Sequence, residues 1–147
     1  MWHGLETVVI FNRVVPRKIS MTGLTFDWDD VEIHGPQVQA ALAELDQDFK
    51  QRVWYRQSSS REGLHVMIAE LDYDTLFGLI LNPIQLPVET QFAYRSKYGE
   101  APWSLECEGR FFSDQVRAAE GFRTSRVFIS KNGMSAGPWK CYGCEEE

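Results

Sequence analysis

The chain has 147 residues, of which 44% are hydrophobic and 24% charged, a composition typical of one ordinary globular domain. Its net charge of −6 argues against a protein that binds nucleic acid non-specifically through bulk positive charge. No apolar run reaches the roughly 20 residues that a membrane-spanning helix needs, so we expect no membrane partner.

The first half of the chain alternates short strand patterns with one helix. Gly35 and Pro36 mark the start of that helix, because proline is favoured in the first turn. Its apolar residues then recur at helical spacing through Gln51. The other expected elements are a buried strand over residues 7–11, a basic loop over 13–22, a strand carrying Asp27 and Asp29, and strands over 53–57 and 64–71.

The second half of the chain mixes helical and strand patterns. Asn132 and Gly133 form a dipeptide typical of a hairpin turn. Before it we expect a short helix over residues 73–81, a second helix over 87–98, and strands over 104–112 and 125–130; after it we expect an edge strand through Trp139 and Tyr142. This order predicts a single α+β domain over residues 1–147, with one mainly antiparallel sheet and helices packed on one side.

Two aspartates in the second strand form the first candidate site. Side chains at positions i and i+2 of a strand share a face, so Asp27 and Asp29 point the same way and Phe26 and Trp28 the other way. Adjacent carboxylates repel each other unless a cation lies between them. Hard oxygen ligands of this kind suit Mg²⁺ or Mn²⁺, which we therefore predict as the cofactor.

A serine-rich turn supplies a second candidate site, for phosphate. Ser58, Ser59 and Ser60 offer hydroxyls and backbone N–H groups that can hold an anion. Arg56 adds a fixed positive charge before the turn, and His65 opens the strand after it. Each segment also has a simpler interpretation. Asp-x-Asp often occurs by chance, and a Ser/Gly loop is usually only a hairpin connection. A lone histidine on an apolar strand is more often a hydrogen-bonded core residue.

The three cysteines predict no disulfide framework. An odd, low count without a signal peptide favours a reducing, cytoplasmic compartment. Cys141 and Cys144 form half of a zinc site, and the chain offers no second Cys-x-x-Cys pair, so zinc is not expected there.

The order of these motifs resembles the catalytic core of the archaeo-eukaryotic primase superfamily, in particular its small virus and plasmid members. The similar pieces are a strand with alternating hydrophobic and Asp residues, then a helix, then Ser-x-x-Gly-x-His opening a strand, then a further acidic stretch. They correspond here to residues 26–29, 58–65 and 95–110. The resemblance covers residues 20–112 and implies a primase-like core related to RRM folds.

The resemblance implies a metal-dependent nucleotidyltransferase acting in nucleic-acid replication. Asp27 and Asp29 would be catalytic metal ligands, with Glu108, or less favourably Glu106, as the third acid. We therefore expect Asp27, Asp29, His65 and Glu108 to converge on one face of the sheet. Arg56, the serines and His65 would hold the phosphates of a nucleoside triphosphate. Single-stranded nucleic acid and a replication protein would be the further partners.

Three other functions remain open from the sequence. The chain could be a catalytically inactive module on the same fold that binds single-stranded nucleic acid or a protein partner. It could be an interaction protein without a site. A rolling-circle nuclease is the least favoured, because it needs paired histidine ligands and the chain has no His-x-His.

Overall fold

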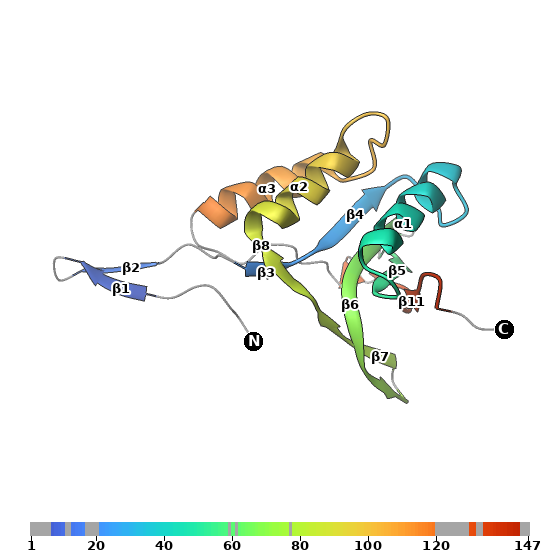
Figure 1. Cartoon of the computed structure of the whole chain (residues 1–147), viewed down its shortest axis with the longest axis horizontal. Coiled ribbons are helices and arrows are strands. Elements are labelled where there is room, and N and C mark those ends of the chain that lie inside the picture. The colour runs from blue at the N-terminus through green and yellow to red at the C-terminus, as the bar shows by residue number, and fades with distance from the viewer. Residues whose placement is uncertain are drawn as a thin grey trace.

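A five-stranded antiparallel sheet organises the molecule (Figure 1). The computed structural model describes residues 7–10, 13–16, 21–58, 60, 62–76, 78–119, 130–131 and 134–144. The strands of this sheet run in the order β11, β5, β6, β4, with β7 also paired to β6. Their bounds are Lys140–Cys141 for β11, Val53–Gln57 for β5, Gly63–Thr75 for β6, Thr25–Asp29 for β4 and Gly78–Pro83 for β7.

Three two-stranded pairs and three helices complete the described fold. Strands β1 and β2 pair antiparallel, as do β3 with β8 and β9 with β10. The helices are α1 (Pro36–Asp48), α2 (Val88–Gly99) and α3 (Glu108–Ala119), and the paired strands are β1 (Thr7–Ile10), β2 (Arg13–Pro16), β3 (Met21–Gly23), β8 (Gln85–Pro87), β9 (Ser130–Lys131) and β10 (Met134–Ser135).

One face of the main sheet carries the hydrophobic core. Phe26 and Trp28 alternate with the aspartates along β4 and are fully buried. Helix α1 covers this face through its apolar stripe, and α2 adds Tyr98, whose ring meets Phe26 edge-on. The members of the core cluster are Leu24, Phe26, Trp28, Val38, Ala41, Leu42, Leu45, Val53, Leu64, Val66, Ile68, Tyr98 and Leu105. The opposite face of the sheet carries Asp27, His65 and Arg56, together with Trp54 and Met67.

Helices α2 and α3 lie side by side (Figure 1). The chain leaves α2, runs along the outer edge of β4, where Glu106 forms a single β-bridge with Trp28, and then begins α3. Cys107 accepts the hydrogen bond from Phe111 N that closes the first helical turn. This path brings the segment before α3 against the aspartates of β4.

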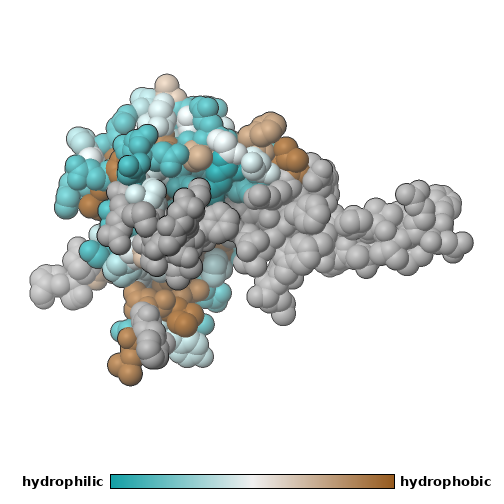
Figure 2. Space-filling view, turned by 180° about the vertical axis from the view of Figure 1, so that it is seen from behind, coloured by the Kyte–Doolittle hydropathy of each residue, from teal (hydrophilic) through white to brown (hydrophobic). Residues whose placement is uncertain are grey.

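Beyond Ala69, the β6–β7 hairpin projects as an arm made of residues 70–82 (Figure 1). Its exposed apolar side chains include Leu71, Tyr73, Leu76 and Ile80. The space-filling view shows hydrophobic residues gathered on this projection (Figure 2). The arm contains three acidic residues and no Lys or Arg.

Most expected elements of the sheet and two helices are confirmed. Strand β5 has the predicted bounds, β4 carries both aspartates, and α1 and α2 lie where helical spacing placed them. The C-terminal edge strand is present as β11. Strands β9 and β10 pair on either side of residues 132–133, which, like the expected strand residues 125–129, lie outside the described part of the chain.

The predicted helix over residues 73–81 is wrong. The described residues of this range belong to the β6–β7 arm, and Leu71, Asp72, Tyr73 and Asp74 alternate apolar and acidic with the period of a strand. The predicted basic loop over 13–22 is also wrong in part, since it contains β2 and most of β3.

The predicted strand over residues 104–112 is wrong as well. Only Glu106 makes a β-bridge, and helix α3 starts at Glu108. The strand prediction rested on an alternation over residues 105–110, with Glu106, Glu108 and Arg110 on one face, but the second half of this run lies in the first turn of α3. The fold is therefore α+β with an antiparallel sheet and three helices among the described residues. None of these helices is long and apolar enough to cross a bilayer.

Candidate functional site: a polar row beside an acidic and thiol cluster

Three polar residues lie in a row across the face of the sheet opposite the core. Asp27 on β4 is directly opposite His65 on β6, and His65 is directly opposite Arg56 on β5. Directly paired residues of neighbouring strands share a face, so all three side chains point away from the core. The expected common face of Asp27 and His65 is confirmed by this register.

The hydrogen bonds of the row fix the state of the imidazole. Arg56 Nε donates to His65 Nδ1 over 3.0 Å, so Nδ1 is the acceptor. Burial, followed by the charges of Arg56 and Arg110, lowers the pKa of His65 to about 4. The ring is therefore neutral at pH 7 and carries its proton on Nε2. That nitrogen lies 4.0 Å from Asp27 Oδ1.

The basic part of the row lies below the surface. Arg56 is 6% exposed and His65 is 4% exposed. The guanidinium of Arg56 stacks on the ring of Trp139, 4.3 Å from its centroid. Burial lowers the pKa of Arg56, although an arginine stays charged at pH 7. The row thus presents a carboxylate to solvent and holds its positive charge underneath.

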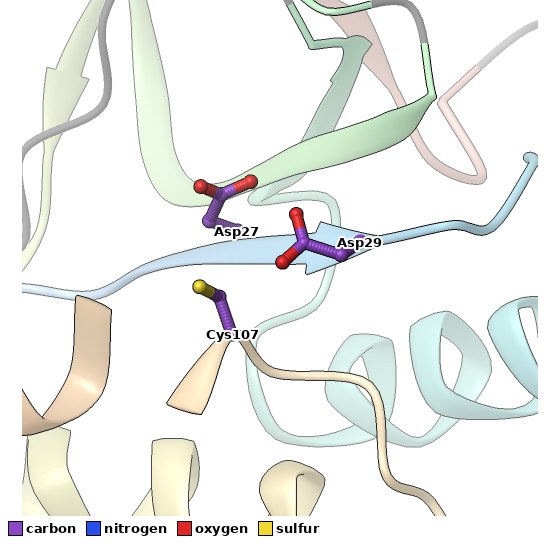
Figure 3. A group of neighbouring side chains, drawn as sticks. All are labelled: Asp27, Asp29 and Cys107. Carbon is purple, nitrogen blue, oxygen red and sulfur yellow. The ribbon is translucent and has the colours of Figure 1, made fainter. Parts of the chain in front are cut away.

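Asp27 and Asp29 also meet a thiol from another part of the chain (Figure 3). One carboxylate oxygen of each aspartate and Sγ of Cys107 all lie within 4.8 Å of one another. Asp29 is exposed, while Asp27 and Cys107 are half-buried. Burial is the main cause that raises the pKa of the Cys107 thiol, and the two carboxylates act in the same direction. Three potential metal ligands therefore converge at the edge of the sheet.

The two glutamates beside Cys107 have other positions. Glu108 is the exposed first residue of α3 and is not part of this cluster. Glu106 is buried: its Oε1 accepts a hydrogen bond from Asp27 N over 2.9 Å, and its Oε2 accepts one from Arg95 Nε over 2.5 Å. The structure does not bring Glu108 to the face of the sheet that the strand prediction gave it.

A buried charge network anchors this edge. Arg95 bonds Glu106 and also Asp114, the latter over 2.7 Å, and all three side chains are almost completely buried. Arg110 adds a contact of 3.4 Å to Glu106 and donates to Thr25 Oγ1. Burial raises the pKa of Glu106, whereas the charges of Arg95 and Arg110 oppose that rise. The network fixes the backbone on both sides of Cys107.

The serine-rich turn is only partly described. Ser58 is buried, and its hydroxyl lies 3.1 Å from that of Ser60. Ser58 N donates to Gly63 O over 2.9 Å, which closes the turn between β5 and β6. The predicted phosphate-binding residue Ser59 lies outside the described residues.

Cys141 and Cys144 lie apart from this cluster. Their sulfur atoms are paired with each other as a disulfide, next to the edge strand β11. Cys107 is the free cysteine. Cys107 had no predicted role, yet its position between the two glutamates considered as the third acid was a usable signal.

No protein family model, curated protein or solved structure matches this chain.

Proposed function

We propose that the face of the sheet with Asp27 and His65 binds a divalent cation together with a nucleoside triphosphate, and that the chain is a nucleotidyltransferase-like domain acting in nucleic-acid replication. The observation that carries the proposal is the cross-strand row of Asp27, His65 and Arg56. It sets a carboxylate that can hold Mg²⁺ or Mn²⁺ beside groups that favour phosphate.

The residues of the site would have different roles in binding. Asp27 and Asp29 hold the cation, which would neutralise the charge of the triphosphate. The hydrogen on His65 Nε2 is a donor for a phosphate oxygen beside the cation. Arg56 acts from below, through its charge and by holding the histidine tautomer, because its guanidinium is covered by Trp139.

Calorimetric titration of the chain with ATP tests the binding step. We expect affinity with Mn²⁺ present and none without it, and Asp27→Asn abolishes this metal dependence. His65→Ala weakens nucleotide affinity by roughly ten-fold, the value of one hydrogen bond to a charged group, while metal binding persists. Asp72→Asn on the arm and the exposed His34→Ala are matched controls and keep wild-type affinity. Equal ATP binding with and without metal refutes the proposal.

Incorporation of labelled nucleotides on single-stranded DNA with Mn²⁺ tests the catalytic step. Asp27→Ala combined with Asp29→Ala eliminates incorporation if these carboxylates hold the catalytic metal. Metal-dependent ATP binding without incorporation would instead identify a catalytically inactive module on this fold. Incorporation that survives the double variant removes the aspartates from the reaction.

A further inference from the structure

The cation cluster contains a soft ligand that the sequence motifs did not suggest. Cys107 comes from the segment between α2 and α3, whereas Asp27 and Asp29 both come from β4 (Figure 3). The set is thus a mixed one, two carboxylates from one strand and one thiol from a segment almost 80 residues further along the chain. Its donor chemistry, and not its negative charge alone, distinguishes it from an ordinary acidic patch.

Hydrogen bonds between β4 and the segment before α3 hold the thiol in this position. Cys107 N donates to Asp27 O over 2.9 Å. In the other direction, Asp27 N donates to Glu106 Oε1, also over 2.9 Å. The β-bridge between Trp28 and Glu106 links the same two segments. Because these bonds connect the two segments at consecutive residues, the fold itself sets the spacing of the three ligands.

We propose that Asp27, Asp29 and Cys107 bind a borderline-soft divalent metal ion of the Fe²⁺ to Zn²⁺ series in preference to Mg²⁺. This inference rests on the proposed function, because it specifies the metal of the same site. Mg²⁺ takes oxygen ligands, while thiolates favour the later first-row metals. Exposed Asp29 leaves the site open on the solvent side, where water or a phosphate oxygen completes the coordination.

Binding changes the protonation of the thiol. Cys107 coordinates as the thiolate, so its proton leaves to the solvent when the metal–sulfur bond forms. No oxidant or reductant takes part. The other two cysteines are paired with each other, so within the described residues Cys107 is the sulfur available to this cluster.

Cobalt titration of the full-length chain tests the proposal. Both Cys141 and Cys144 are first replaced by Ser, so that any thiolate signal comes from Cys107. Co²⁺ then serves as the probe, because a cobalt–thiolate bond produces a near-ultraviolet charge-transfer band that carboxylates do not. Circular dichroism confirms that each variant is folded.

The expected result is a charge-transfer band that saturates at one Co²⁺ per chain and survives excess Mg²⁺. Cys107→Ser abolishes the band and weakens Co²⁺ binding by about ten-fold or more, with little effect on Mg²⁺. Cys107→Asp shifts the preference towards Mg²⁺. Glu108→Gln, which changes the neighbouring acid outside the cluster, leaves the band unchanged.

Co²⁺ binding without the band overturns the inference, as does a Glu108→Gln variant that loses the metal as completely as Cys107→Ser. These outcomes are separate from those of the proposed function. If Cys107→Ser leaves metal-dependent ATP binding intact, the proposed function stands and the thiol is not a metal ligand. If the cobalt–thiolate band is present but ATP does not bind, the metal site stands and the proposed function is refuted.

Discussion

At the scale of single residues, the acid that pairs with two arginines has a structural task. Glu106 is one of the two glutamates considered as a third catalytic acid, yet both of its carboxylate oxygens are bonded within the protein. Its partner Arg95 has no exposed surface and also neutralises Asp114. Buried charges persist only when each one is matched, so the three side chains act as a unit.

Removing Arg95 therefore takes the fully buried positive charge away from two buried carboxylates, Glu106 and Asp114. We expect Arg95→Met to destabilise the fold by about 3–5 kcal/mol, measured by urea unfolding at pH 7. The matched control is Arg52→Ala, which breaks the solvent-exposed pair with Glu70 and costs less than about 1 kcal/mol. Equal losses in the two variants would show that burial of the network has no energetic consequence.

At the scale of elements, the two-residue period of a strand predicted the aspartates of the candidate site but not its thiol. The i and i+2 spacing of Asp27 and Asp29, with His65 at the start of the next strand motif, was sufficient to predict their common face. The third ligand was not predictable in this way. The apolar residues of 104–107 do not continue a regular strand or helix spacing. Helix α3 begins where Asp114 can reach Arg95, and local spacing does not encode this tertiary contact.

The register between β4 and β6 depends on one glycine. Gly63 pairs with Asp29 at the end of the ladder, and a Cβ there would overlap the carbonyl oxygen of Trp28 and lie 3.3 Å from Asp29 Cα. A side chain at this position would push β6 away from β4. The row of Asp27 and His65 lies two residues further along the same ladder and would shift with it.

We accordingly expect Gly63→Ala to lower stability by roughly 1–3 kcal/mol, the usual cost of overpacking, and to weaken metal binding. Gly109→Ala is the matched control, because a Cβ there meets no heavy atom within 4 Å and the residue is helical. Alanine at that position changes stability by at most about 1 kcal/mol, in the favourable direction. Thermal unfolding and cobalt titration measure the two effects. Wild-type values for Gly63→Ala would contradict the close approach of the strands.

At the scale of the whole molecule, the core and the β6–β7 arm are separate in their packing. Every residue of the core cluster lies between Leu24 and Ile68 or in the segment that contains Tyr98 and Leu105. The described residues of the arm add none, and Leu76 near its tip is 99% exposed. Elements with few buried apolar contacts contribute little to global stability, so the sheet should not need the arm to fold.

Shortening the arm tests this division. Residues 71–81 are replaced by Asn-Gly, which can close a two-residue hairpin between Glu70 and Asn82, a directly opposed pair. We expect urea unfolding to remain cooperative, with a free energy within about 1 kcal/mol of wild type, because ordinary surface changes have effects of this size or less. Metal binding at Asp27 should also be unchanged. Ile68→Ala, one residue before the last buried position of β6, removes a core side chain and should cost about 2–5 kcal/mol. A shortened chain that unfolds as easily as this core variant would mean that the arm supports the sheet.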